Sequence, residues 1–405
     1  MTPQPSNPFH SHPWPGMSEG RIPFSYPAIS DIDLFWSINA IINETEPSKI
    51  GTYSLVREFE NKFSKYIGCK YAIAVSSATT GLEACYLAVN DRADCSVITT
   101  PFTFHSTVSS AVRAGMNVTL VDVVKDGFHI DDEMVMEAIE EVSEFGDYPR
   151  AICVVHIYGV PCNMYRYDFL DKEKVTVIED AAHAMGASYE SGKYAGRKVG
   201  SIEDNLCVFS FNQQKILSAF GGGMITTGNK ELAEKIRCIV HQGMIRNGAH
   251  RNQVMPGIKG GMEEFNAAMG IRQLEAVDDI ISKRKNIASI YHSQLSGING
   301  IDTPVWIEPI NGAVWSHYTI CALRQSYLAE KLLENKVETQ VAYRAIHRHP
   351  YWESHESIRR FGRLSQSEVA SSYVLSLPIF PSMNLEHILK VSSLVKKYGE
   401  VKQCQ

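Results

Sequence analysis

The chain has 405 residues, of which 44% are hydrophobic and 21% are charged, and its formal net charge is −6. This length predicts a sizeable core and two domains, and the composition is that of an ordinary soluble globular protein. The negative charge argues against nucleic acid or an anionic membrane as the main partner.

The first residues, MTPQPSNPFHSHPWPG, contain five prolines and lack the apolar segment of a signal peptide. No apolar run approaches the ~20 residues that cross a bilayer. The nine cysteines are scattered, without a CxxC pair or a zinc spacing, which favours reduced thiols and no metal site. We therefore expect a loose N-terminal arm and a cytoplasmic protein that does not span a membrane.

From about residue 55, short apolar runs alternate with amphipathic stretches. The stretches predict helices at 80–89, 105–114, 131–142 and 230–241. The runs predict seven strands, at 71–75, 96–99, 118–122, 151–155, 175–179, 206–210 and 224–227. This order predicts an α/β fold with a mostly parallel seven-stranded sheet covered on both faces. Ligands of such sheets bind at the carboxyl ends of strands.

The second half of the chain has a different pattern. Residues 242–261 are polar and irregular, and residues 263–295 have a long helical pattern. Beyond about residue 300 we expect strands at 315–323 and 338–343 and helices at 325–335 and 385–397. The prediction is an arm over residues 1–25, a large domain over 26–260, and a linking helix with a smaller C-terminal α/β domain over 261–405.

Two residues at strand ends suggest a cofactor with a pyridine ring. Lys215 follows a predicted strand in VFSFNQQK, where desolvation favours a neutral amine that can form an imine. Asp180 ends an apolar strand in VIEDAAHAMGA, where a carboxylate is costly unless it meets a cation or several donors. A protonated pyridine nitrogen is such a cation, and a helix cap is the alternative. His183 is expected on the same face, near the ring or its phenolic oxygen.

Two further segments complete the expected site. VSSATTGLEA, residues 75–84, predicts a helix N-terminus with hydroxyls that suits a phosphate, or a plain N-cap. TTPFTFHST, residues 99–107, places aromatics after a strand, so one of them stacks on the cofactor ring or packs in the core. The expected phosphate contacts are Thr79, Thr80 and Ser210, the expected ring contact is Phe104, and Ala78 is expected to be a further cofactor-binding residue. All four segments follow predicted strands and should converge on one sheet edge.

In order and spacing, these motifs resemble the sugar aminotransferases of the fold-type I pyridoxal-phosphate superfamily, the DegT/DnrJ/StrS group. Other matching stretches are FENKFSKYIG (59–68), VITTPFTF (97–104), VVHIYGVPCNM (154–164), FNAAMGIRQLEAVD (265–278) and YRAIHRHPYW (343–352). The resemblance implies pyridoxal 5'-phosphate bound as a Schiff base on Lys215, with Asp180 at the pyridine nitrogen. It also implies a homodimer whose subunits share their active sites.

Two positions depart from the family pattern. Gly221 stands where the family commonly has Glu, and Gly261 stands in a loop where a partner subunit often contributes a second polar residue. Lys259 is the candidate contributor in trans, as a point charge for an anionic group. Arg344 and His347 are expected to line the substrate cleft or, alternatively, to lie on the surface of the small domain. The phrases PWPG, EDAAHA and YRAIHRHPYW resemble the cyclitol branch more than the nucleotide-sugar branch.

The resemblance implies a transaminase that moves an amino group from glutamate or glutamine to a keto group of a sugar or cyclitol, in amino-sugar, antibiotic or glycan biosynthesis. Lys215 would act as general base and acid. It also argues against the related dehydratases, which carry histidine there. Two alternatives stay open. One is an enzyme like 3-amino-5-hydroxybenzoate synthase, which forms an aminated carbocycle with dehydration or aromatisation. The other is a non-catalytic regulatory protein that binds pyridoxal phosphate.

Overall fold

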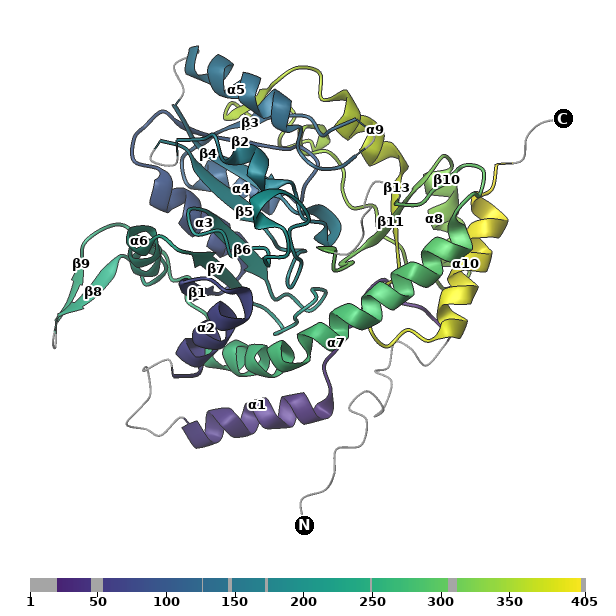
Figure 1. Cartoon of the computed structure of the whole chain (residues 1–405), viewed down its shortest axis with the longest axis horizontal. Helices are drawn as coiled ribbons and strands as arrows, with labels where there is room; N and C mark the ends of the chain where they lie inside the picture. Colours follow the sequence, from purple (N-terminus) through teal and green to yellow (C-terminus); the bar gives the residue numbers. More distant parts are fainter. Residues whose placement is uncertain are drawn as a thin grey trace.

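The computed structural model describes residues 20–44, 54–125, 127–144, 148–171, 174–247, 250–304 and 312–401. Its main feature is an eight-stranded sheet with the order β1-β7-β6-β5-β4-β2-β3-β12 (Figure 1). The strands are β1 (Tyr71–Val75), β2 (Cys95–Thr99), β3 (Asn117–Leu120), β4 (Tyr148–Val155), β5 (Thr176–Asp180), β6 (Leu206–Ser210), β7 (Gly223–Thr227) and β12 (Ile358–Arg360). The first seven coincide with the predicted strands, whereas β12 adds an edge strand from the C-terminal part.

The sheet is mostly parallel, as predicted. Only β7 runs antiparallel to its neighbours β1 and β6, and the other five pairings are parallel. Strands β2, β5 and β6 are buried along their whole length, which explains why they are continuous apolar runs in the sequence. Because these strands are parallel, their carboxyl ends lie at the same edge of the sheet.

Helices cover both faces of the sheet and form a separate core with each. The core on one face includes residues of α3 (Ala78–Val89), α4 (Ser106–Arg113) and α6 (Lys230–Val240). The core on the other face includes residues of α2 (Ser54–Ile67), α5 (Asp132–Glu144) and the first half of α7 (Glu264–Leu295). Burial on both faces accounts for the rigid sheet that carries the site.

Helix α7 connects this sheet to a smaller unit (Figure 1). Its second half packs in a third core. That core holds a small sheet of order β10-β11-β13, with β10 (Ile301–Asp302), β11 (Tyr318–Ala322) and β13 (Val374–Leu377). Helices α8 (Gln325–Glu334) and α10 (Leu385–Gly399) complete it, and α9 (Ser365–Tyr373) precedes β13.

Several local expectations are wrong. Residues 338–343 form no strand and make only an isolated bridge, at Gln340; β13 is the third strand of the small sheet instead. The stretch 242–261 contains a hairpin, β8 (Met244–Asn247) and β9 (His250–Gln253), whose second strand is exposed and so lacks an apolar signal. Helix α1 (Asp31–Glu44), which packs along α7, was not expected.

The division of the chain at residues 25 and 260 stays a prediction. Residues 1–19 of the expected arm lie outside the described residues. After them, Ile22 pairs with Val337 in the C-terminal part of the chain. Strand β12 also belongs to the C-terminal part, yet it pairs with β3 of the large sheet. The two parts are therefore joined by more than α7.

Candidate active site

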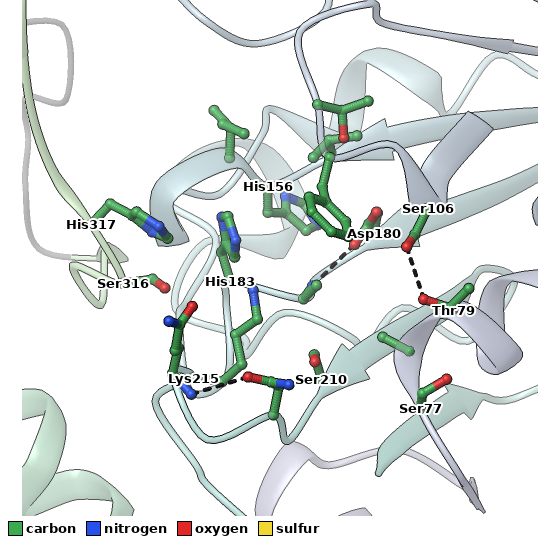
Figure 2. Close-up of a pocket in the computed structure, with 18 of the residues that line it drawn as sticks. Ser77, Thr79, Ser106, His156, Asp180, His183, Ser210, Lys215, Ser316 and His317 are labelled. Carbon is green, nitrogen blue, oxygen red and sulfur yellow. Dashed lines mark hydrogen bonds between the residues drawn. The ribbon is translucent and has the colours of Figure 1, made fainter. Parts of the chain in front are cut away.

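The ends of β1, β5 and β6 border a cavity of about 310 Å³, a volume in the range of small-molecule sites. Figure 2 shows Ser77, Thr79 and Ser106 on one side of it and His183 and His317 on the other, with Asp180 between them. The predicted residues that line it are Lys215, Asp180, His183, Phe104, Ser210, Ala78 and Thr79. The four sequence segments therefore converge as expected.

Lys215 lies in the loop after β6 and lines the cavity. Its backbone N–H donates to the carbonyl of Asn212 at 2.9 Å, which stabilises the tight turn that carries it. Burial of the ammonium group lowers the pKa of Lys215 to about 8, and the negative charge of Asp180 opposes this shift. A lysine of this kind supplies a substantial fraction of neutral, nucleophilic amine near pH 8.

Asp180 is the last residue of β5, and its side chain is buried. The hydroxyl of Thr107 donates to Oδ2 at 2.8 Å, and the backbone N–H of Ala182 donates to Oδ1 at 3.1 Å. Burial raises the pKa of Asp180, while these two hydrogen bonds and Lys215 lower it. Each oxygen keeps a lone pair, so the carboxylate can accept the N–H of a pyridinium ring.

A cluster of hydroxyls lies at the N-terminus of α3. Ser77 caps the helix by accepting the Thr80 N–H at 3.0 Å, and the Thr79 hydroxyl lies 2.8 Å from that of Ser106. Ser77, Thr79, Ser106 and Ser210 all line the cavity. Hydroxyls together with a helix N-terminus form an anion site, so this corner fits the phosphate of pyridoxal phosphate.

The structure modifies one expected phosphate contact. The Thr80 hydroxyl lies 3.1 Å from that of Ser76 and 2.9 Å from that of Ser77, and Thr80 is not part of the cavity lining. Ser77 lies at the cavity instead, because it is the N-cap residue that precedes the first turn of α3, whereas the Thr80 hydroxyl is engaged with Ser76 and Ser77. We therefore assign the expected role of Thr80 to Ser77.

The ring-binding side of the cavity is open. The side chain of Phe104 is 46% exposed, and its ring centroid lies 5.8 Å from that of Tyr343. The core-packing alternative is therefore not favoured, and a face of Phe104 is available to a flat ring. His183 is buried, with its ring centroid 4.6 Å from that of His317.

Besides Thr80, three expected residues, Arg344, Lys259 and His347, do not line this cavity. Arg344 and Lys259 are exposed, and the backbone of Lys259 pairs with His241. His347 is buried, and its Nε2 lies 3.0 Å from Glu368 of α9, because the short helix Ile346–Arg348 turns it away from the site. Gly261 pairs with Val75 outside the cavity. The roles proposed for Arg344 and His347 thus lack support within a single chain.

Gly221, the other departure from the family pattern, does line the cavity. Its φ is +152°, a conformation that side chains disfavour, and the residues on either side, Phe220 and Gly222, also have positive φ. Its N–H donates to the carbonyl of Phe211 at 3.2 Å. The glycine thus fits the local backbone, and a glutamate here would require a different loop conformation.

Sequence reasoning missed part of the lining. His156 directly follows β4, so the rule that ligands bind after strand ends was a usable signal for it. Ser316, His317 and Gln340 come from the C-terminal part of the chain, and no local pattern marks them; Tyr343 begins the matching stretch YRAIHRHPYW but was not expected at the site. The Ser316 hydroxyl and the Nδ1 of His317 are buried and lack a hydrogen-bond partner among the described residues. Polar groups in this state are available to a ligand.

A buried network supports the strand end from the opposite face. Glu179 accepts hydrogen bonds from Tyr189 at 2.6 Å and from Asn205 at 2.9 Å, and its Oε2 lies 2.8 Å from Nε2 of His156. The N–H of Cys162 donates to Nδ1 of His156 at 2.9 Å, so the ring must donate from Nε2 to Glu179. The backbone N–H of His156 donates to the carbonyl of Asp180 at 3.1 Å. The network thus holds β5 against the residues that follow β4.

Together, the sheet topology and the Lys215–Asp180 cavity define a class of enzyme, the pyridoxal-phosphate-dependent aminotransferases of fold-type I. Comparison with known proteins then gives the family. The model of the DegT/DnrJ/EryC1/StrS aminotransferase family matches residues 37–396, and the chain belongs to this family.

Individual relatives agree with this assignment. An uncharacterized protein of Methanocaldococcus jannaschii is 31% identical over 89% of this chain and 94% of its own. The UDP-4-amino-4-deoxy-L-arabinose–oxoglutarate aminotransferase of Shewanella sediminis is 27% identical over 94% and 99%. The crystal structure of S. venezuelae DesV in complex with a ketimine intermediate is 26% identical, with a TM-score of 0.79 over 95% of this chain and 100% of that one.

These findings confirm the predicted family, the fold class, the aminotransferase activity and the cofactor. The regulatory alternative, a fold that retains the cofactor without turnover, has no support among them. The residues that hold the cofactor in this chain remain an inference from the geometry of the cavity.

Proposed function

We propose that this protein transfers an amino group from glutamate or glutamine to a ketone of a sugar, with pyridoxal phosphate bound covalently at Lys215. The observation that carries the proposal is the placement of Lys215 and Asp180 in one cavity that is also lined by the hydroxyls of Ser77, Thr79, Ser106 and Ser210, two of them at the N-terminus of α3. The amine, the carboxylate and the anion site match the aldehyde, the ring nitrogen and the phosphate of the cofactor.

The chain contributes binding and proton transfer. When bound, pyridoxal phosphate supplies an electron sink for the charge that develops as the amino group moves. Asp180 would hold the ring nitrogen and keep it protonated. Lys215 would move a proton between the α-carbon of the amino donor and the cofactor carbon, a role that suits an amine whose pKa is about 8. Phe104 would orient the ring.

Two classes of acceptor compete. The Shewanella sediminis relative, which matches nearly the whole chain, is named as an aminotransferase of a UDP-linked amino sugar, and this supports a keto-sugar for this protein. The motif phrasing of the sequence favours a keto-cyclitol, and the aromatising carbocycle reaction belongs to the same class of acceptor. We propose the keto-sugar, and amino-sugar biosynthesis as its setting, with antibiotic biosynthesis as one pathway of that kind.

We also propose a homodimer with shared sites. Helix α1 exposes five large apolar side chains, with Phe35 72% exposed, and an apolar patch of this kind marks an interaction surface. The patch consists of Ile32, Phe35, Trp36, Ile38 and Ile42. Lys259 is exposed and remains the candidate for a contact in the partner's site. Sedimentation should give a dimer for the wild type and a weaker dimer for Phe35→Asp. The control Leu333→Asp, at an exposed position of α8, should dimerise as the wild type does.

A cytoplasmic location remains part of the proposal. Eight of the cysteines lie in described residues and are free thiols, which fits a reducing compartment. No helix in the described part of the chain is long and apolar enough to cross a membrane.

The proposal is tested by a two-step spectroscopic experiment. The protein loaded with pyridoxal phosphate should absorb in the visible, and Lys215→Ala should not. Glutamate or glutamine should remove the band, and the matching ketone should restore it. UDP-linked keto-sugars and keto-cyclitols form the two arms of the screen, and an aromatic product in the second arm would identify the aromatising reaction. A wild-type protein that binds no pyridoxal phosphate would refute the whole proposal.

A further inference from the structure

Tyr343 is a polar residue of the cavity with no role in the chemistry proposed above. It is half-buried, and it belongs to the C-terminal part of the chain. Its ring lies nearly parallel to that of His183, at an interplanar angle of 20°, and close to the ring of Phe104. Its hydroxyl lies 3.0 Å from Nε2 of His183.

The hydrogens of this pair can be placed from the surrounding hydrogen bonds. The backbone N–H of Tyr158 donates to Nδ1 of His183 at 3.2 Å, so that nitrogen carries no hydrogen. Burial, together with the charges of Lys215 and His317, lowers the pKa of His183 well below its usual range. The neutral ring therefore carries its hydrogen on Nε2 and donates it to the oxygen of Tyr343.

This leaves the hydrogen of the Tyr343 hydroxyl without a protein acceptor among the described residues. Burial and the nearby charge of Asp180 raise the pKa of Tyr343, so the hydroxyl keeps its hydrogen. Two tyrosines of the core differ in this respect: Tyr86 donates to the carbonyl of Thr107 at 3.0 Å, and Tyr291 donates to that of Pro378 at 2.9 Å. A buried hydroxyl that faces a ligand cavity with a free hydrogen is a donor for the ligand.

We propose that Tyr343 is a further binding residue of the active site, whose hydroxyl, oriented by His183, donates a hydrogen bond to an oxygen of the ligand bound beside Lys215. The inference rests on the proposed function. The acceptor is either the ring oxygen of the cofactor or an oxygen of the sugar. Because both ring nitrogens of His183 are engaged, His183 is a positioning residue that acts through Tyr343. The expected position of His183 near the ring or its phenolic oxygen stays a prediction, and the contact with the ligand is assigned to Tyr343.

The test compares Tyr343→Phe with Tyr291→Phe, a matched control in which a buried tyrosine outside the cavity loses one hydrogen bond to a carbonyl. If the acceptor is the cofactor, Tyr343→Phe changes the ratio of the visible to the near-ultraviolet band without substrates, by ~3- to 10-fold for one hydrogen bond. If the acceptor is the sugar, the spectrum and the half-reaction with the amino donor stay unchanged, and the KM of the ketone rises ~3- to 10-fold. The control should behave as wild type in both measurements.

The inference is overturned if Tyr343→Phe matches the control in spectrum and in the KM of the ketone. Tyr343→Leu provides the same two measurements if the phenylalanine variant does not fold. A wild-type protein without a visible band would instead contradict the proposed function. A wild-type band combined with an unaltered Tyr343→Phe variant contradicts only the role of Tyr343.

Discussion

Replacing Thr107 with valine removes one hydrogen bond from the buried carboxylate of Asp180 and keeps a side chain of similar shape. The Thr107 hydroxyl donates to Oδ2 of Asp180 at 2.8 Å, so its contact with Thr103 at 2.9 Å requires Thr103 to be the donor there. After the substitution, the N–H of Ala182 at 3.1 Å is the only protein hydrogen bond left to this carboxylate among the described residues.

The expected effect follows from the strength of that bond. A hydrogen bond to a charged group contributes ~1.5–3 kcal/mol. Burial already raises the pKa of Asp180, and losing a donor to the carboxylate raises it further. Because only the ionised form pairs with a protonated ring nitrogen, the affinity for pyridoxal phosphate should fall by ~10- to 100-fold. As the pH is lowered, cofactor binding should also be lost at a higher pH in the variant than in the wild type.

The affinity is measured by titrating the apoprotein with pyridoxal phosphate and following the visible band. Thr99→Val is the matched control, because the buried hydroxyl of Thr99 donates at 2.9 Å to the carbonyl of Cys153 rather than to Asp180. Urea unfolding of both variants separates loss of affinity from loss of stability. If Thr107→Val binds the cofactor as tightly as Thr99→Val, the assigned role of the Thr107–Asp180 bond is wrong.

Three other outcomes are expected. When pyridoxal phosphate is added to the apoprotein, the visible band should form at a rate that rises with pH and levels off above about 8, because the neutral amine of Lys215 reacts. A rate that levels off only near pH 10 would contradict the lowered pKa of Lys215. Glu179→Ala should lower the free energy of unfolding by ~3–5 kcal/mol in urea titrations, since it leaves the buried partners of Glu179 unpaired; a loss below ~1 kcal/mol would argue against the network. Gly270→Ala should cost ~1–3 kcal/mol by the same assay, because its Cβ would lie 2.5 Å from the ring of Phe59; an unchanged midpoint would show that α2 and α7 can separate freely.

Local patterns predicted most of the large sheet because its strands are short and fully buried. Such strands are unbroken apolar runs, and β5 and β6 were found in this way with Asp180 at the end of one and Lys215 shortly after the other. Strand β12 was not predicted because it has only three residues, two of them exposed, and pairs at the sheet edge. The second strand of the β8–β9 hairpin was not predicted for the same reason, since an exposed strand has no apolar signal.

The sequence by itself determined the family, most of the large sheet and the placement of Lys215 and Asp180 at one edge of it, because parallel strands bring their carboxyl ends to one edge whatever the details of packing. Only the tertiary structure decided which side chains around that pair face the cavity. It placed Ser77 there rather than Thr80, and it brought Tyr343 against His183 across 160 residues of chain. Contacts of this kind depend on how the C-terminal part packs against the sheet, and no local pattern encodes that packing.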